Sequence, residues 1–277
     1  MATKDYSAIT AADGTVLRHP ERPEPRYNPM RAWKNFRLLM KDKEDTSLVF
    51  KIYESLPSKH FMPRIEELAM SPLGDQLRAS EPSLPEILDD HAALRKTPKG
   101  SLAHAYCDFM ESEGLTAAGL VAEAESLGRA KYDDVVQWFS ERSRDTHDLF
   151  HVLTGYGRDA LGEQCVLLFT HGQSPTQGHL LIGYAGSFNI KLQIKGSKAP
   201  VMGAVNQAKS TGRGAPPLLR QPIRELLKQP IEDVRAKLNI PEPTLYNECH
   251  RIWRSEGIDP YDLLGSENTP ESEPLAA

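Results

Sequence analysis

The sequence predicts an all-α fold, a multi-helix bundle. Apolar residues recur with a period of about 3.6 residues along most of the chain, which is the spacing of amphipathic helices. No segment alternates β-branched and polar residues as a half-buried strand does. Proline and glycine stand between the periodic segments or in their first turns, where helices end or begin. These punctuating residues are Pro57, Pro63, Pro72, Gly74, Pro82, Gly100, Gly114 and Gly157.

The periodic segments give the expected helices in order. They are 29–41, 46–56, 62–70, 73–79, 84–90, 102–113, 117–128, 133–155, 158–170, 178–194, 201–210, 223–228, 231–238 and 243–256. No repeat of fixed length relates them.

Composition divides the chain into three parts. Residues 1–25 are rich in proline and charge and are expected to form a loosely ordered arm. Residues 26–265 form a single helical domain in this prediction. Residues 266–277 are acidic, contain proline, and are expected to be a disordered tail.

Charge and cysteine usage exclude several classes of protein. A net charge of −5 over 277 residues argues against nucleic-acid binding, which usually requires a basic domain. Three widely spaced cysteines without a C-x-x-C pair favour a reducing compartment. We find no secretory signal, transit peptide or spanning segment, so we expect a cytoplasmic protein, soluble or peripheral, of bacterial type.

The segment from Lys191 to Lys237 is basic, with ten Lys/Arg and three Asp/Glu, and it follows the apolar run Leu180–Ile190. An apolar helix beside basic residues suits an anionic membrane surface or a pyrophosphate-bearing lipid. A charged solvent-exposed face without a ligand accounts for the same pattern.

The residues that carry chemistry lie in the middle of the chain. His147 and His151 are four residues apart, so on a helix they occupy one face. Asp148 lies within an arc of roughly 100° with them. A turn near Gly155 and Gly157 returns the chain, and the following helix brings Glu163 back toward the pair.

Glu163 enters a helix whose following residues, 165–169, are apolar on every side, which is typical of a buried helix. An ionised carboxylate there needs a cationic partner. A metal ion supplies one, and so does Arg158 or Arg144.

The sequence therefore predicts a metal site made by His147, Asp148, His151 and Glu163. Two nitrogens and two carboxylates suit Zn²⁺, with Fe²⁺ or Mn²⁺ as alternatives. Arg144 and Asp159 are expected to support these ligands by hydrogen bonds, with ordinary surface salt bridges as the alternative.

The same histidines also fit arrangements without this site. His147 and His151 could be capping or core residues, with Glu163 the partner of an arginine. An HD-type phosphohydrolase would recruit a further histidine from upstream, at His60, His91 or His104. The remaining candidates stand alone along the chain and are expected to be structural: His171, His179 and His250.

The stretch from His147 to His151, eleven residues and then Glu163 resembles the ubiquinone (coenzyme Q) biosynthesis family often called Coq-four, whose motif is H-D-x-x-H-x(11)-E. Arg144 before the motif and the segment 101–115, which ends in a Gly-Leu turn, resemble the same family. We expect the resemblance to cover about residues 27–264. The basic segment from Lys191 to Lys237 departs from it.

The resemblance implies an all-helical protein that binds zinc through the motif, lies peripherally on the inner face of the bacterial inner membrane, and binds polyprenyl lipids. It implies C1 decarboxylation of 4-hydroxy-3-methoxy-5-polyprenylbenzoate to 2-methoxy-6-polyprenylphenol. Asp148 or a metal-bound water would supply the proton, and Leu180–Ile190 with Phe188 would line a groove for the prenyl tail.

The competing function is a non-catalytic, lipid-binding scaffold with a structural zinc. Such a scaffold would organise the other quinone-biosynthesis enzymes into a complex. The same ligands serve both functions, and the sequence also leaves a homodimer open.

Overall fold

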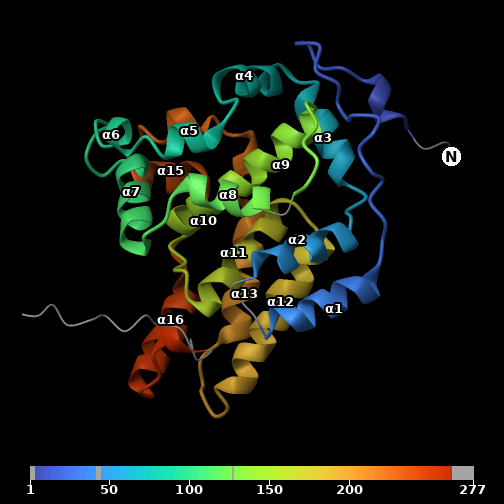
Figure 1. Cartoon of the computed structure of the whole chain (residues 1–277). Coiled ribbons are helices and arrows are strands. Elements are labelled where there is room, and N and C mark those ends of the chain that lie inside the picture. Colours follow the sequence, from blue (N-terminus) through green and yellow to red (C-terminus); the bar gives the residue numbers. More distant parts are fainter. Residues whose placement is uncertain (1–3, 42–44, 127, 264–277) are drawn as a thin grey trace, which may run out of the picture.

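The computed structural model describes residues 4–41, 45–126 and 128–263, and it confirms the all-α prediction (Figure 1). Within those ranges no strand forms, and two isolated bridges pair Thr10 with Val16 and Ser101 with Pro230. The α-helices are α1 Pro29–Leu39, α2 Thr46–Ser55, α3 Phe61–Ala69, α4 Pro72–Ser80, α5 Leu84–Leu88, α6 His91–Leu94, α7 Leu102–Glu113, α8 Ala117–Ser126, α9 Val135–Asp145, α10 His147–Thr154, α11 Ala160–Gln173, α12 Gln177–Gln193, α13 Val201–Gly214, α14 Ile223–Leu226, α15 Ile231–Lys237 and α16 Thr244–Ser255.

One of the expected helices is divided into two helices in the structure. The segment 133–155 divides into α9 and α10 at Thr146. The Thr146 hydroxyl donates to the carbonyl oxygens of Arg142 and Ser143, at 3.0 and 3.2 Å. A hydroxyl that bonds back to the preceding turn competes with the backbone ladder and bends a helix. The short helix α6 and the 3₁₀ turns Tyr6–Ala8, Leu218–Arg220 and Pro260–Asp262 were not expected.

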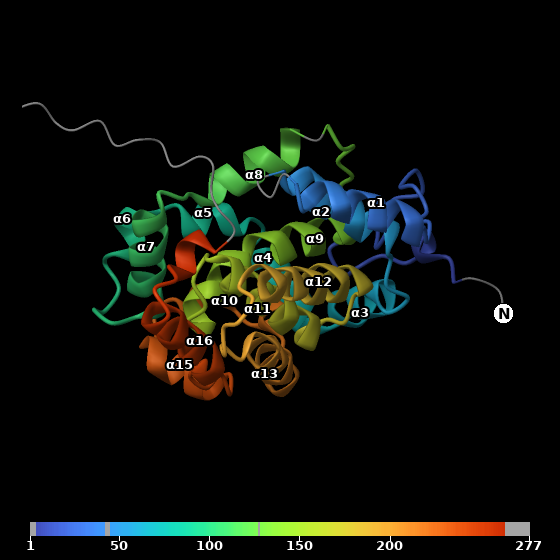
Figure 2. The same cartoon turned by 90° about the horizontal axis from the view of Figure 1, so that it is seen from below.

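Helix α11 occupies the centre of the structure and packs against α10, α12 and α13 (Figures 1 and 2). Its contact with α13 is close because glycine lies where the helices meet. A Cβ on Gly212 would come 2.1 Å from the carbonyl oxygen of Phe169, which is far inside van der Waals contact. The surrounding core includes Leu149, Val166 and Trp253, all without exposed surface.

Two smaller apolar clusters flank this core. In the first, α1 and α2 pack on α12 through Phe36, Ile52 and Ile182. In the second, the N-terminal segment packs on α3 and α9, and its Leu17 is buried beside Ile65. The described part of the expected loose arm, residues 4–25, is therefore packed in part, because its few apolar residues find partners far along the chain.

A buried ion pair joins distant segments. Arg142 on α9 contacts Glu81 at 2.8 Å, and both side chains are 1% exposed. Arg142 also donates to the carbonyl oxygens of Leu219 and Gln221, and Glu81 accepts from the backbone N–H of Arg224. Every charge in this pair is thus also hydrogen-bonded, as burial requires.

In the part of the chain that the structure describes, no helix is both long and apolar enough to cross a membrane. The expected disordered tail, 266–277, lies outside the described residues.

Candidate metal centre

The hairpin of α10 and α11 brings three of the four expected ligands together. His147 and His151 come from α10, and Glu163 comes from the first turn of α11. The Nε2 atoms of the two histidines are 3.3 Å apart. Glu163 Oε2 lies 3.5 Å from Nε2 of His147, and the other carboxylate oxygen, Oε1, lies 3.5 Å from Nε2 of His151.

These separations fit a tetrahedral divalent ion. Zn²⁺ binds nitrogen and oxygen at about 2.0–2.2 Å, so two of its ligands lie about 3.4 Å apart. The spacing of the two imidazole nitrogens is within 0.2 Å of that edge, and so is the spacing from each nitrogen to one of the two Glu163 oxygens. Two histidines and one glutamate leave a fourth position for substrate or water, which is the pattern of catalytic zinc sites.

The orientation of His151 is fixed by the backbone. Its Nδ1 lies 3.0 Å from the carbonyl oxygen of Tyr156. A carbonyl only accepts, so Nδ1 carries the hydrogen and Nε2 presents its lone pair to the site. Phe109 of α7 stacks on the same imidazole at 5.6 Å. The Phe109 contact arises from the tertiary fold, and the Tyr156 contact arises from the turn that follows α10.

Glu163 is held as a carboxylate. Burial acts to raise its pKa, but His151 and His147 outweigh burial and hold the pKa well below the usual range. For His147, burial acts to lower the pKa, but the hydrogen bond to Glu163 and the charge of Glu163 outweigh burial. The pKa of His147 is therefore raised above its ordinary value. Arg158, an expected alternative partner, lies 3.9 Å from Glu163 at the edge of ion-pair distance.

Asp148 is not part of the group. Its ligand atoms lie outside the set formed by His147, His151 and Glu163. The Asp148 side chain is buried, and after burial its charge is the largest contributor to the raised pKa of Tyr106 on α7. The step of about 100° from His147 to the next helical residue turns the carboxylate aside.

The two residues expected to support the ligands have other partners. Arg144 donates to Asp145 at 2.6 Å rather than to a ligand. Asp159 caps α11 by accepting from the N–H groups of Leu161 and Gly162. It also accepts from the Tyr246 hydroxyl on α16. Asp159 therefore supports the helix that carries Glu163 without reaching the site itself.

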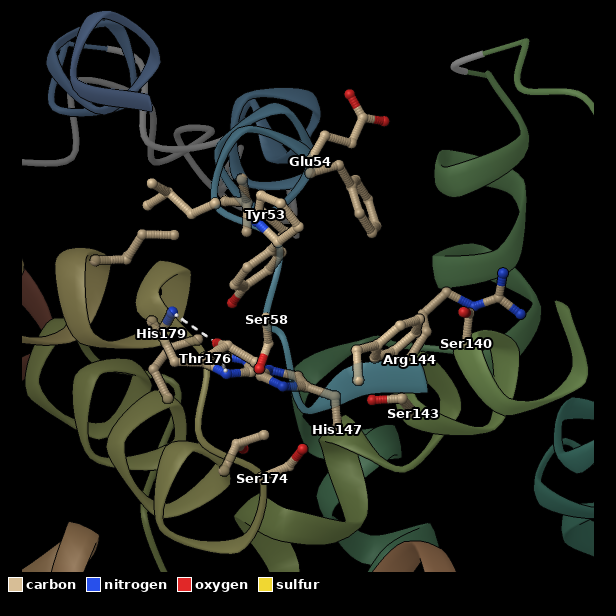
Figure 3. Close-up of a pocket in the computed structure, with 18 of the residues that line it drawn as sticks. Tyr53, Glu54, Ser58, Ser140, Ser143, Arg144, His147, Ser174, Thr176 and His179 are labelled. Carbon is tan, nitrogen blue, oxygen red and sulfur yellow. Dashed lines mark hydrogen bonds between the residues drawn. The ribbon is translucent and has the colours of Figure 1, made fainter. Parts of the chain in front are cut away.

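The centre opens into a large pocket, about 3090 Å³ in volume. His147 and Glu163 line it, and Tyr53 of α2 enters from the opposite side with its hydroxyl turned toward Thr176, His179 and His147 (Figure 3). Tyr53 was not expected from the sequence, because only the fold brings α2 over this hairpin.

Tyr53 is held in place by α12. Its ring contacts His179 edge-on at 4.8 Å. A Cβ on Gly178 would come 2.3 Å from the ring, so only glycine allows this approach. His179 bonds to Thr176 at 2.7 Å, and burial together with His171 and His147 lowers its pKa to about 3. His179 was expected to be structural, and it also forms part of the pocket wall.

The residues expected to line a groove for the prenyl tail divide between the pocket and the outer surface. Ile182 and Gly186, within the run Leu180–Ile190, line the pocket. Phe188 does not, because it lies on the outer face of α12 and is 56% exposed. The helical period carries Phe188 out of the pocket that Gly186 faces.

The upstream histidines stay apart from the centre. Among the described residues, His60 and His104 belong to no candidate metal group, and His91 belongs to a second one with Cys107 and Glu111. In that second group Arg95 already binds the Glu111 carboxylate at 2.7 Å. The histidine that an HD-type phosphohydrolase requires is therefore not at the His147 centre.

The fold and the site define a class: an all-α protein with two histidines and a glutamate on a helical hairpin beside a large pocket. The family model described as coenzyme Q (ubiquinone) biosynthesis protein Coq4 matches residues 40–244. The chain belongs to the Coq4 family.

Similar proteins carry the same description. The chain is 26% identical to the bovine mitochondrial ubiquinone biosynthesis protein COQ4 homolog over 180 residues, 65% of each chain. It is 24% identical to the human homolog over 181 residues, 65% of this chain and 66% of that one. It thus spans just under two thirds of these mammalian relatives. A Penicillium rubens relative, mitochondrial ubiquinone biosynthesis protein coq4, is 21% identical over 267 residues, 92% of this chain and 90% of its own.

A crystal structure from Nostoc punctiforme, provisionally described as a ubiquinone biosynthesis protein, has a similar fold. The TM-score is 0.57 at 19% sequence identity, and the match covers 78% of this chain and all of that one. At this identity the likeness concerns the fold alone.

Proposed function

We propose that this protein acts in ubiquinone biosynthesis and removes the C1 carboxyl of 4-hydroxy-3-methoxy-5-polyprenylbenzoate, giving 2-methoxy-6-polyprenylphenol. Membership of the Coq4 family supports the pathway. The observation that carries the reaction is the convergence of His147, His151 and Glu163, whose ligand atoms approach one another to 3.3–3.5 Å, at the wall of a large pocket.

In this proposal His147, His151 and Glu163 hold a divalent metal ion, Zn²⁺ or else Fe²⁺ or Mn²⁺. The bound ion would supply a Lewis acid for an anionic oxygen of the substrate. Because His151 is fixed through Nδ1, its donor atom needs no reorientation when the ion binds. Glu163 would bind the cation as a carboxylate, and His147, whose pKa is raised by Glu163, would bind it after losing a proton.

The reaction requires one proton. The bond from C1 to the carboxyl carbon breaks, CO₂ leaves, and C1 keeps the electron pair and takes up a proton. Asp148 and Tyr53 both line the pocket and are the groups that we propose to deliver this proton or to orient the head group. Asp148 lies outside the group formed by His147, His151 and Glu163, so in this proposal it does not bind the ion.

The size of the pocket supports a substrate with a long tail. Sites for ordinary small molecules measure about 300–1,000 Å³, and this pocket is about 3090 Å³. Its apolar lining includes Val49, Leu56, Leu167 and Ile182. We propose that these side chains hold the polyprenyl chain while the head group reaches His147.

The same size favours a second function, a lipid-binding scaffold with a structural zinc. Such a protein would present prenylated intermediates to other quinone-biosynthesis enzymes. The two functions differ in what metal removal does. Removing a structural ion unfolds the ligand hairpin, whereas removing a catalytic ion stops turnover and leaves the fold.

The test uses the full chain and a short-chain prenylated 4-hydroxy-3-methoxybenzoate labelled at the carboxyl. We expect labelled CO₂ from the metal-loaded protein, none after chelation, and recovery when the ion is restored. Circular dichroism should stay helical throughout. CO₂ release that survives chelation and the His151→Ala substitution contradicts the proposed reaction. Loss of helix on chelation, without CO₂ release before it, supports the scaffold.

A further inference from the structure

Helix α1 exposes large apolar side chains on its outer face. Met30 is 83% exposed, Trp33 is 53% exposed and Leu38 is 42% exposed, and Tyr27 just before the helix is 59% exposed. Side chains of these types are normally buried, and an exposed row of them marks a contact surface. We call the face formed by Met30, Trp33, Lys34, Arg37 and Leu38 the α1 outer face.

The α1 outer face is basic on an acidic protein. Residues 26–41 contain five Lys/Arg and no Asp/Glu, although the whole chain carries a net charge of −5. Within the described residues Arg31 contacts Glu54 at 3.3 Å, whereas no acidic side chain pairs with Lys34 or Arg37. These two cations lie between Met30, Trp33 and Leu38, so apolar and cationic groups share one surface.

The inner face of α1 is buried in the protein. Ala32, Phe36 and Leu39 are buried against α2 and α12. Asn28 caps the helix by accepting from the Arg31 N–H. The helix is therefore held rigidly with its apolar, basic side outward, and it lies at the edge of the molecule, outside α2 and α12 (Figures 1 and 2).

This edge borders the pocket. Leu39 and Met40 at the end of α1, and Val49 and Tyr53 on α2, all line the space that contains His147. A surface that binds the α1 outer face is therefore next to the pocket wall formed by these two helices.

We propose that the α1 outer face docks on an anionic lipid bilayer, with Trp33, Met30 and Leu38 entering the interface and Lys34 and Arg37 bound to lipid phosphates. Amphipathic helices with Trp, Leu and Lys/Arg bind membrane interfaces in this way. Each basic side chain near an anionic surface strengthens binding roughly fivefold. This surface differs from the basic segment 191–237 expected from the sequence.

Docking does not depend on the proposed decarboxylation. If the proposed function holds as well, the arrangement places the pocket beside the bilayer that dissolves the prenyl tail. The substrate would then reach the centre along the edge between α1 and α2.

The test is flotation of the full chain with vesicles of phosphatidylcholine alone or of an equal mixture with phosphatidylglycerol. We expect binding to the mixture only. Lys34→Gln with Arg37→Gln should weaken it at least about tenfold, and Met30→Ser with Trp33→Ser should abolish it. Two matched controls should bind as wild type: Lys198→Gln with Lys237→Gln, which removes equal charge from the basic segment, and Met70→Ser, which alters an equally apolar side chain that is 55% exposed elsewhere.

Trp33 also provides a direct signal. Trp253 is fully buried and Trp138 is partly buried, so Trp33 is the most solvent-exposed of the three tryptophans. Its fluorescence should shift to the blue on adding anionic vesicles, and Trp33→Phe should bind normally without that shift. Equal binding by the wild type and the Lys34/Arg37 variant overturns the proposal. So does a wild-type dimer that the Met30/Trp33 variant loses, without any vesicle binding, because the face would then pair two copies of the chain.

Discussion

The carbonyl oxygen of Tyr156 lies 3.0 Å from Nδ1 of His151 and thereby decides which nitrogen of that imidazole faces Glu163. The carbonyl is positioned by the turn after α10, where Gly155 has a left-handed φ of 73°. A side chain there is strained, because L-residues rarely adopt this conformation. The metal centre thus depends on a backbone turn that contributes no ligand.

Substituting Gly155→Ala should weaken metal binding more than it weakens the fold. Moving the Tyr156 carbonyl frees the His151 imidazole, and losing such a support typically costs about 10–100-fold in metal affinity. The measurement is Zn²⁺ affinity by chelator competition, beside the unfolding temperature. Gly257→Ala is the matched control, since Gly257 has the same φ of 73° but belongs to the turn after α16, where a Cβ would meet no atom within 4 Å. Equal affinity in the two variants contradicts the role of the turn.

Removing Glu81 should be strongly destabilising. Glu81→Ala leaves the Arg142 guanidinium buried without its carboxylate, and such a loss costs about 3–5 kcal/mol. Glu67→Ala removes an exposed partner of Arg220 and should cost no more than about 1 kcal/mol. Denaturant unfolding of both variants gives the comparison. Similar values for the two would mean that the buried pair contributes little.

Asp134 should make the protein sensitive to acid. Burial acts to raise its pKa, but Arg22 and the backbone N–H groups of His19 and Gln137 outweigh burial and lower it. A lowered pKa means that the carboxylate stabilises the fold above its unfolded pKa, about 3.9, and that this contribution is lost as the pH falls through the lower folded value. Below about pH 5 the wild type should lose stability faster than Asp134→Asn. If the free energy of unfolding fell equally with pH in both proteins, the ionisation of Asp134 would not contribute to the loss of stability in acid.

Tyr53→Phe should weaken head-group binding and spare the metal. The substitution keeps the ring that packs on Gly178 and His179 and removes only the hydroxyl. One hydrogen bond to a charged group contributes about 1.5–3 kcal/mol, so we expect a loss of roughly 10–100-fold in affinity. The probe is 4-hydroxy-3-methoxybenzoate titrated by calorimetry into the metal-loaded protein. Tyr184→Phe is the control, because that hydroxyl bonds Asn206 outside the pocket. Unchanged affinity for Tyr53→Phe would place the head group elsewhere.

Local sequence patterns were sufficient for most of the helices. The expected segment 102–113 is α7 to the residue, because Ser101 caps it and Gly114 ends it in the left-handed conformation. The break at Thr146 escaped prediction, since the apolar period continues across it and only the hydroxyl bond to Arg142 marks it. The period of the apolar residues predicts which face of a helix is buried, but it does not predict where the helix bends.

The positions of site residues were predictable where they follow from the spacing of residues along one helix. The i,i+4 relation placed His147 beside His151, and the turn brought Glu163 back to them. Asp148 was expected in the group because it follows His147 in the sequence. It lies outside the group, because one helical step turns its side chain toward α7. Tyr53 lies more than ninety residues before His147, and its approach depends on α2 packing over α12, which no local pattern encodes.

The most direct test of the three-ligand centre is bound metal measured by elemental mass spectrometry on protein purified without added ions. We expect about one Zn²⁺ per chain in the wild type and in Asp148→Asn, and almost none in Glu163→Gln or His151→Ala. The Asp148→Asn result separates the three-residue group from the four-residue set expected from the sequence. Equal metal content in wild type and Glu163→Gln, or no metal in any of the proteins, would contradict the centre described here.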